Sequence, residues 1–331
     1  MKKIIAMLFV LPASSVFGQT FLIDSVRSPL VHTFSIVARD SITGEMGVAV
    51  QSHWFSVGSV VSWAEAGVGA VATQSLVNPS FGIRGLELLK AGKTAKEAVQ
   101  ELIAADTGRE FRQLAIIDAK GNVFSFTGAK CIPEAGNIIG KNFSVQANLM
   151  LNNKVPGAMQ KAFSETSGAL AERMVAALEA GQAAGGDIRG QQSAAILIVK
   201  GTSTGKVWED KLIDLRVEDN PHPIVELKRL LNVYRAYEHM NNGDAATEKS
   251  DWALALKEYG EAEKMFPDNL EMKFWHAVNL VNKGKIDDSL PLFKEIFTKE
   301  KNWQILLPRL TKIGLLTADD ASVKRILEQG K

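Results

Sequence analysis

Two patterns of hydrophobic residues divide the chain into two parts. From residue 33 to about residue 216, short runs rich in β-branched and apolar residues occur in pairs, and the pairs alternate with helical windows. The run 194–199 is wholly apolar, which a strand tolerates only where both of its faces are covered. The predicted strands are 33–40, 47–54, two segments within 60–74, 113–118, 123–127, 143–150, 193–199 and 212–216. The predicted helices are 82–91, 94–106, 155–163 and 169–180.

Strand pairs that alternate with helix pairs predict an α+β fold in which two sheets pack face to face between two layers of helices. We therefore expect a four-layer αββα sandwich over residues 33–218. Local signals agree with these elements: Gly121 lies in a tight turn between two strand runs, and Thr94 with Glu97 forms a capping box at a helix start.

The pattern changes after residue 218, because every window from 219 to 331 is helical. Apolar positions of the segment 252–269 recur 34 residues later in the chain, and 34 residues is the period of tetratricopeptide repeats. The characteristic offsets are occupied by Tyr259, Ala262 and Pro267. We expect Gly243 near a helix–helix turn and a capping helix pair at 303–328. The sequence thus predicts an all-α, tetratricopeptide-like domain, a class that commonly presents a groove to a peptide or protein partner.

The N-terminus has the order of a secretory signal. Two lysines, Lys2 and Lys3, precede an apolar run at 4–11, and small residues lead to Gly18. We expect a signal peptide at 1–18, an N-terminal segment at 19–32, and a periplasmic or secreted protein.

Charge and composition exclude several classes of partner. The 38 basic residues nearly balance the 37 acidic ones, so we expect no nucleic-acid partner. No apolar stretch is long enough to predict a membrane span. The single cysteine, Cys131, cannot form an intrachain disulfide, and the histidines lack metal-binding spacing, so we expect no metal and no cofactor. We also expect a homo-oligomer.

Polar residues next to buried strands are the candidates for chemistry. In the glycine-rich loop 185–195, Asp187 and Arg189 either present hydrogen-bond donors to a ligand or form a structural bridge that ties down the loop. Further polar groups in this loop are Gln191, Gln192 and Ser193. Other candidates for substrate binding are Ser35, Gln51, Ser52, Gln74, Asn78 and Asn148. His53 is either an acid–base group or a hydrogen-bonded residue at a strand end.

Three long motifs, at 33–89, 112–131 and 184–200, resemble a bacterial family of domains of unknown function assigned to the N-terminal-nucleophile (Ntn) hydrolase-like fold. The resemblance implies the same four-layer sandwich. The chain departs from the family pattern CxxWAGH, because the stretch that begins at Cys131 reads CIPEAGN.

The resemblance also implies a mechanism. Ntn hydrolases cleave amides with an N-terminal Ser, Thr or Cys, whose α-amine is the general base and titrates near about 7.7 to 8.0. Thr33 begins the first strand, where this nucleophile would lie. Signal cleavage after Gly18 would leave residues 19–32 ahead of it, so the mechanism requires a second cut between His32 and Thr33. The alternative is that Thr33 and Ser35 only line one face of a strand.

Two functions follow from these observations. The first is an exported Ntn-type hydrolase that acts on a small amide or peptide, with Thr33 as nucleophile and base. The second is a non-catalytic periplasmic or secreted binding module whose helical tail engages a protein or peptide. A third possibility is catalysis by His53 together with Ser52 or Ser56.

Overall fold

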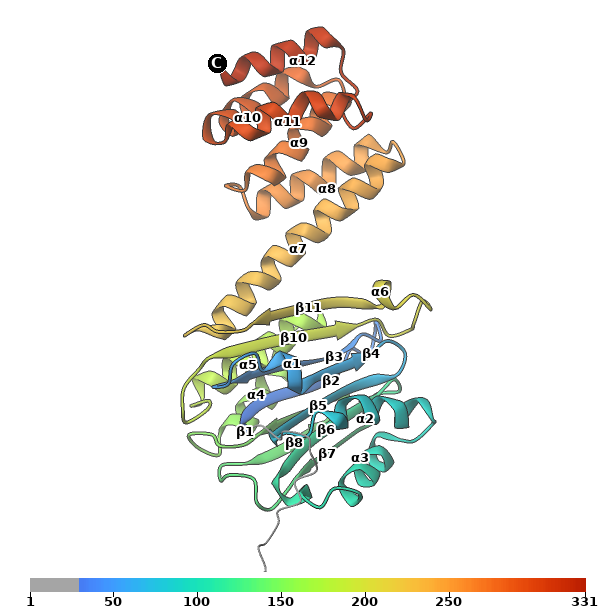
Figure 1. Cartoon of the computed structure of the whole chain (residues 1–331), viewed down its shortest axis with the longest axis vertical. Helices are drawn as coiled ribbons and strands as arrows, with labels where there is room; N and C mark the ends of the chain where they lie inside the picture. Colours follow the sequence, from blue (N-terminus) through green and yellow to red (C-terminus); the bar gives the residue numbers. More distant parts are fainter. Residues whose placement is uncertain (1–29) are drawn as a thin grey trace, which may run out of the picture.

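The computed structural model describes residues 30–331, so the signal peptide predicted at 1–18 and most of the segment predicted at 19–32 lie outside the described residues. Strands and helices alternate as far as Val217, and only helices follow (Figure 1). The mixed α+β class and the C-terminal helical region are therefore confirmed. The predicted boundary at 218 falls between the last strand and the first helix of that region.

Both sheets are antiparallel throughout. In the first sheet the order is β1-β5-β6-β7, with β4 also paired to β5. Its strands are β1 (Leu30–Val31), β4 (Ser62–Glu65), β5 (Gly69–Leu76), β6 (Arg112–Asp118) and β7 (Val123–Thr127). In the second sheet the order is β11-β10-β3-β2-β9-β8. Its strands are β2 (Thr33–Arg39), β3 (Met46–Ser52), β8 (Gly136–Gly140), β9 (Phe143–Ala147), β10 (Ser193–Val199) and β11 (Lys211–Val217).

The two sheets meet across an apolar layer. Strand alternation turns Val37 of β2 and Val50 of β3 toward Ala72 of β5 and Ala115 of β6, and all four belong to one buried cluster. On β10, Ala195 extends the same layer. Since the neighbouring residues on each strand must face the other way, each sheet needs a second apolar cover on its outer face.

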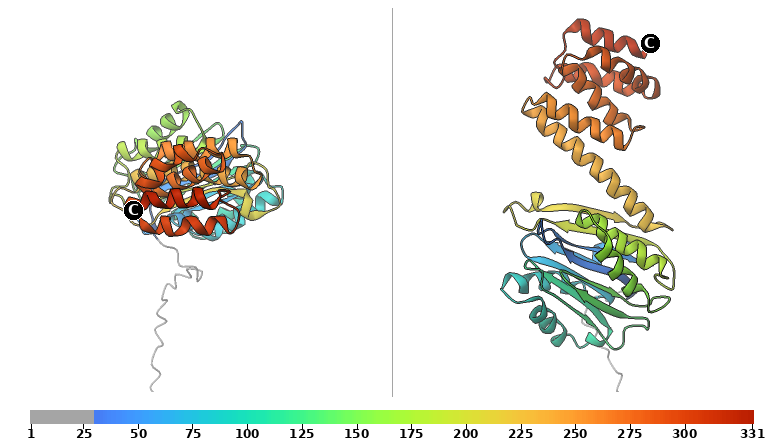
Figure 2. Two further views of the ribbon diagram at one scale, coloured as in Figure 1. Left: turned by 90° about the horizontal axis from the view of Figure 1, so that it is seen from above. Right: turned by 180° about the vertical axis from the view of Figure 1, so that it is seen from behind.

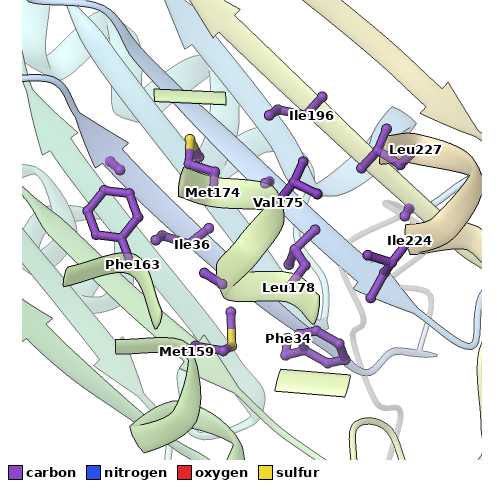
Figure 3. Packing of buried hydrophobic residues seen from close by; sticks show 14 of the residues in the cluster. Phe34, Ile36, Met159, Phe163, Met174, Val175, Leu178, Ile196, Ile224 and Leu227 are labelled. Atoms are coloured by element: carbon purple, nitrogen blue, oxygen red, sulfur yellow. The ribbon is translucent and has the colours of Figure 1, made fainter. Parts of the chain in front are cut away.

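Helix pairs supply these covers. On the first sheet, α2 and α3 pack against β5 and β6. On the second sheet, α4 and α5 cover the outer face, where Phe34 and Ile36 of β2 contact Met159, Met174 and Leu178 (Figure 3). Figure 2, right, shows these helices from behind the view of Figure 1. The bounds are α2 (Ser80–Lys90), α3 (Ala95–Ala104), α4 (Val155–Glu165) and α5 (Leu170–Ala183).

Short elements complete the α+β part. Two short helices, α1 (Gly58–Val61) and α6 (Val207–Asp210), and a 3-10 turn at Arg109–Phe111 join the strands. The capping box of α3 is present, since the Thr94 side chain accepts from the Glu97 backbone and Glu97 reaches back to Thr94. In the turn between β2 and β3, Asp40 Oδ1 accepts from the backbone N–H of Ile42 (2.8 Å) and Thr43 (2.9 Å). Asp40 is therefore a turn-forming residue.

One long helix, α7 (Pro223–Glu248), connects the sheets to the other helices (Figure 1). Its first turns bury Ile224 and Leu227 in the cluster over the second sheet (Figure 3), and its later turns pack on α8. The remaining helices are α8 (Trp252–Met265), α9 (Leu270–Asn282), α10 (Ile286–Lys299), α11 (Lys301–Thr311) and α12 (Asp320–Leu327), followed by a 3-10 turn at Glu328–Gly330. No helix within residues 30–331 is long and apolar enough to cross a membrane.

We expected Gly243 near a helix–helix turn, and the structure places it within a helix instead. Gly243 lies inside α7, and the turn comes later, before Asp251, whose side chain caps α8 by accepting from the Leu254 backbone. The glycine has a packing role instead, because a Cβ at position 243 would lie 2.6 Å from a ring carbon of Tyr259. Its small size lets α7 and α8 approach closely.

Candidate functional site

The layer between the sheets changes from apolar to polar toward one end. Val37 on β2, Ala72 on β5 and Ala115 on β6 are apolar. Two positions further along the same faces of these strands lie the polar residues Ser35, Gln74 and Gln113. The polar set comprises Thr33, Ser35, Ser52, Gln74, Gln113, Gln146 and Asn148, and each of these residues has 0 % exposure. Buried polar groups cost free energy unless they are paired, so their partners decide what this end of the domain can do.

A chain of hydrogen bonds links the two sheets through neutral groups. Ser35 Oγ donates to Gln74 Oε1 (2.6 Å) and accepts from Gln146 Nε2 (2.6 Å). Gln74 Nε2 donates to Gln113 Oε1 (2.6 Å), which also accepts from Asn148 Nδ2 (2.9 Å). Because Ser35, Gln146 and Asn148 come from the second sheet and Gln74 and Gln113 from the first, the network fixes the two sheets relative to each other at this end.

The chain crosses from one sheet to the other at His32. The preceding residue, Val31, pairs with Ser75 of the first sheet, whereas the following residue, Thr33, pairs with Ser52 of the second. The Thr33 hydroxyl donates to the Val31 carbonyl (3.0 Å). His32 is 2 % exposed and its Nδ1 lies 2.7 Å from Asn148 Oδ1. The peptide bond between His32 and Thr33 is thus held between the sheets at the polar end.

The carbonyl of this peptide bond accepts two hydrogen bonds. Ser52 Oγ donates to the His32 oxygen at 2.6 Å, and Arg189 Nη2 donates to it at 2.9 Å. Arg189 is oriented by Asp187 through Nε–Oδ1 (3.0 Å) and Nη2–Oδ2 (2.7 Å) contacts, and the Asp187 carboxylate is buried. One neutral donor and one cationic donor therefore face the oxygen on which negative charge develops if the carbonyl carbon is attacked.

Burial favours the neutral form of the His32 imidazole. Burial lowers the pKa of His32 below its ordinary value of 6.5; the Asn148 hydrogen bond opposes this shift and the nearby Arg189 charge adds to it. The amide nitrogen of Asn148 is already used as a donor to Gln113, so its oxygen accepts from His32 Nδ1–H. His32 Nε2 is then a buried acceptor without a partner among the described residues.

This arrangement predicts a pH dependence of stability. Because the folded pKa of His32 is depressed, the unfolded chain binds a proton more readily, and the folded state loses stability as the pH falls below about 6.5. In the chain with the His32–Thr33 bond intact, as the structure has it, we expect His32→Gln to flatten the fall of the unfolding temperature between about pH 7.5 and 5. The exposed His222 provides the matched control, His222→Gln. Parallel curves for His32→Gln and the parent would contradict the assignment.

The structure brings about half of the predicted site residues together. Ser35, Gln74 and Asn148 belong to the network, while Ser52 and Arg189, oriented by Asp187, reach the His32 carbonyl. His53 is exposed, and its backbone N–H donates to Asp187 (3.2 Å). The Asp187–Arg189 pair therefore forms the structural bridge, and its remaining donor is bonded to the His32 carbonyl; a role toward a ligand stays a prediction.

Other predicted residues lie elsewhere. Gln51 stands opposite Phe34 and Ala194, which belong to the helix-covered cluster, so its side chain faces away from Thr33; neither of its amide atoms has a partner among the described residues. Asn78 accepts from the Ser80 backbone (3.1 Å) in a turn at the start of α2.

The last residues of the 185–195 loop have structural contacts. Ser193 Oγ donates to the Trp54 carbonyl and accepts from the Val57 N–H (3.1 Å). Gln192 donates to Asp219 (3.2 Å), and Gln191 is half-buried outside the network.

Four members of the polar end were not among the predicted site residues. They are His32, Gln113, Thr127 and Gln146; the Gln113 side chain donates to Thr127 (2.8 Å) and to the Ala147 carbonyl (2.9 Å). The available signal was a glutamine inside each of two apolar strands, RQLAIID and FSVQA. Within residues 30–331, no three His, Cys, Asp or Glu side chains are placed to hold a metal ion.

The fold and the site define the class of this protein. It is an α+β domain of two facing antiparallel sheets, with a buried polar end where the first long strand begins. The chain belongs to a family of unknown function, DUF1028, whose family model matches residues 33–227. A solved structure of this family, protein SPO2555 from Silicibacter pomeroyi, is 31% identical and superposes with a TM-score of 0.55 over 60% of this chain and 88% of that one. No curated protein matches the chain.

Proposed function

We propose that the protein is an exported Ntn-type hydrolase that acts on a small amide or peptide, with Thr33 as nucleophile and general base after a cut between His32 and Thr33. The observation that carries this proposal is the pair of donors, Ser52 and Arg189, on the His32 carbonyl. A carbonyl held by a hydroxyl and a guanidinium is prepared for attack by a neighbouring nucleophile.

The fold supports the same proposal. Two facing sheets with a helix pair on each outer face match the order of layers in an αββα sandwich. The polar end lies where β2 begins, which is the place where the resemblance to Ntn hydrolases puts the nucleophile.

The proposed cut proceeds through an ester. The Thr33 oxygen attacks the His32 carbonyl carbon, and the negative charge passes to the oxygen held by Ser52 and Arg189. When the C–N bond breaks, its electron pair stays on the Thr33 nitrogen, which gains the proton lost by the hydroxyl. Water then hydrolyses the ester, so that His32 ends as a carboxylate and Thr33 regains its hydroxyl with a free amine.

The new α-amine would supply the base that the intact chain lacks. An α-amine titrates near about 7.7 to 8.0, whereas the amide nitrogen of the uncut chain has no basicity at this pH. With the cut strand displaced, the same two donors would face a substrate carbonyl, and the network of Gln74, Gln113 and Gln146 would offer neutral donors and acceptors to its amide. This complement of groups suits a small amide or peptide.

The decisive experiment is intact mass and N-terminal sequencing of the protein exported by a bacterial host. We expect a chain that starts at Thr33, recovered from the periplasm or medium, because export and the second cut are both part of the proposal. A chain that starts near Gln19 would show that export occurs without the cut and would contradict the assignment of Thr33 as a base.

The second candidate is a binding module with a tetratricopeptide-like tail. Helix α8 begins at Trp252 and α10 at Ile286, a separation equal to the 34-residue tetratricopeptide period, and α8, α9 and α10 pack in sequence. This module would act without hydrolysis. It is favoured over the hydrolase if the mature chain retains His32 and no amide substrate is cleaved.

A further inference from the structure

A cavity of about 420 Å³ lies among the helices of the C-terminal region, remote in sequence from the polar end of the sheets. It is lined by residues of α7, α8 and α9, together with Leu315 from the segment after α11. Its walls are of two kinds. Trp275, Val278 and Leu315 contribute apolar surface, and Asp244, Glu248 and Glu271 contribute carboxylates.

The charge of this cavity is not balanced by the protein. None of the described lining residues is lysine, arginine or histidine. The hydrogen bonds to these carboxylates come from neutral groups: Tyr259 donates to Asp244 (2.6 Å), and Tyr237 donates to Glu271 (2.7 Å). These hydroxyls orient the carboxylates without neutralising them, so the cavity attracts a cation.

A second feature points to a ligand independently of the charge. Asn279, on α9, lines the cavity, is 1 % exposed, and its Oδ1 has no hydrogen-bond partner in the part of the chain that the structure describes. An unpaired buried acceptor is destabilising, and a leucine at this position would avoid that cost. A ligand that donates an N–H to Asn279 would explain why an amide is present there.

We propose that this cavity binds the side chain of a lysine or arginine from a peptide partner. The alkyl stem would pack on the apolar side chains of Trp275, Val278 and Leu315. The terminal ammonium or guanidinium would meet the carboxylates of Asp244 and Glu248 and donate to Asn279 Oδ1, while Glu271 adds to the negative charge of the cavity. A free polyamine has the same chemistry, and the experiment below separates the two sources.

The test is calorimetric titration of the full chain with a blocked pentapeptide, acetyl-Gly-Gly-Lys-Gly-Gly-amide, and with the same peptide carrying Nε-acetyl-lysine. We expect the lysine peptide to bind and the acetylated one to fail, since acetylation removes the charge. Cadaverine measures the free amine. Binding of the peptide at least as tight as that of cadaverine supports a peptide partner, whereas binding of cadaverine alone overturns that part of the proposal.

Two variants locate the site. We expect Asp244→Asn/Glu248→Gln to weaken peptide binding by about tenfold to hundredfold, the effect of losing charge-assisted hydrogen bonds. The control Asp288→Asn removes a charge from an exposed position on α10 outside the cavity and should leave binding unchanged. Equal binding of the lysine and acetyl-lysine peptides, or a double variant that binds like the parent, would overturn the proposal.

Asn279→Leu distinguishes a binding residue from a structural one. We expect it to raise the unfolding temperature, because it removes an unpaired buried oxygen, while it weakens peptide binding. Loss of both stability and binding would overturn the role given to Asn279. The proposal is independent of Thr33, since the uncut Thr33→Ala chain should bind the peptide as the parent does.

Discussion

Replacement of Thr33 by alanine is expected to leave the His32–Thr33 bond intact and to abolish amide hydrolysis. The alanine has no hydroxyl to attack the His32 carbonyl, and without the cut there is no free α-amine to serve as base. The measurement is intact mass of the exported protein, followed by an amide-substrate screen on the parent and the variant. The fraction of chains cleaved between His32 and Thr33 should fall from complete to undetectable.

Two further variants control this prediction. Thr33→Ser keeps a hydroxyl and should retain the cut, at a lower rate. Thr73→Ala removes another buried threonine hydroxyl, on β5, and should leave the cut unchanged. A Thr33→Ala chain that is still shortened to position 33, or that still hydrolyses the substrate of the parent, would show that another group does the chemistry; Ser52 or Ser56 with His53 would then be examined first.

Loss of either donor to the His32 carbonyl is expected to slow the cut by about 10² to 10³-fold, the usual effect of removing one donor to a developing oxyanion. Ser52→Ala removes the 2.6 Å hydrogen bond. Removal of Arg189 alone would leave the buried Asp187 carboxylate without its charged partner. The charge-balanced double variant Asp187→Asn/Arg189→Met is therefore the better choice. The rate is followed by mass spectrometry on uncut protein.

Ser144→Ala is the matched control for Ser52→Ala. Ser144 is also a fully buried serine facing the layer between the sheets, but its hydroxyl donates to Gln146 (3.1 Å) and not to His32. We expect its cutting rate to equal that of the parent, with circular dichroism confirming that all the variants fold. Equal rates for Ser52→Ala and Ser144→Ala would show that the two donors only fasten the strand and do not assist a reaction.

Most of the helices and strands could be predicted because their signals are local. The apolar run 194–199 became the fully buried β10, and the Thr94–Glu97 box caps α3. The edge strand β8, GNIIG, was missed because it is short and flanked by glycines. Gly243 was assigned to a turn because a glycine is the usual turn signal, whereas the contact that requires it comes from Tyr259, on the next helix.

The candidate site could be predicted only in part. Thr33, Ser52 and Arg189 were named, but no residue pattern showed that the last two donate to the carbonyl preceding the first. Gln51 was grouped with Ser52, although adjacent strand residues face opposite sides. His32 was named only as the residue before the cut, because its contacts at the polar end come from the crossing between the sheets.

The sequence by itself determined the strand and helix periods, the division near residue 218 and the polar residues that interrupt apolar strands. These features depend only on neighbours within a few positions of the sequence, so they can be recognised before the fold is known. Only the tertiary structure decided which polar residues meet. Residues 32, 52 and 189 converge because β2 begins, β3 ends and the loop before β10 lies at the same end of the central strands of the second sheet. Periodicity shows which face of a strand is buried, but pairing and register between strands decide what that face contacts.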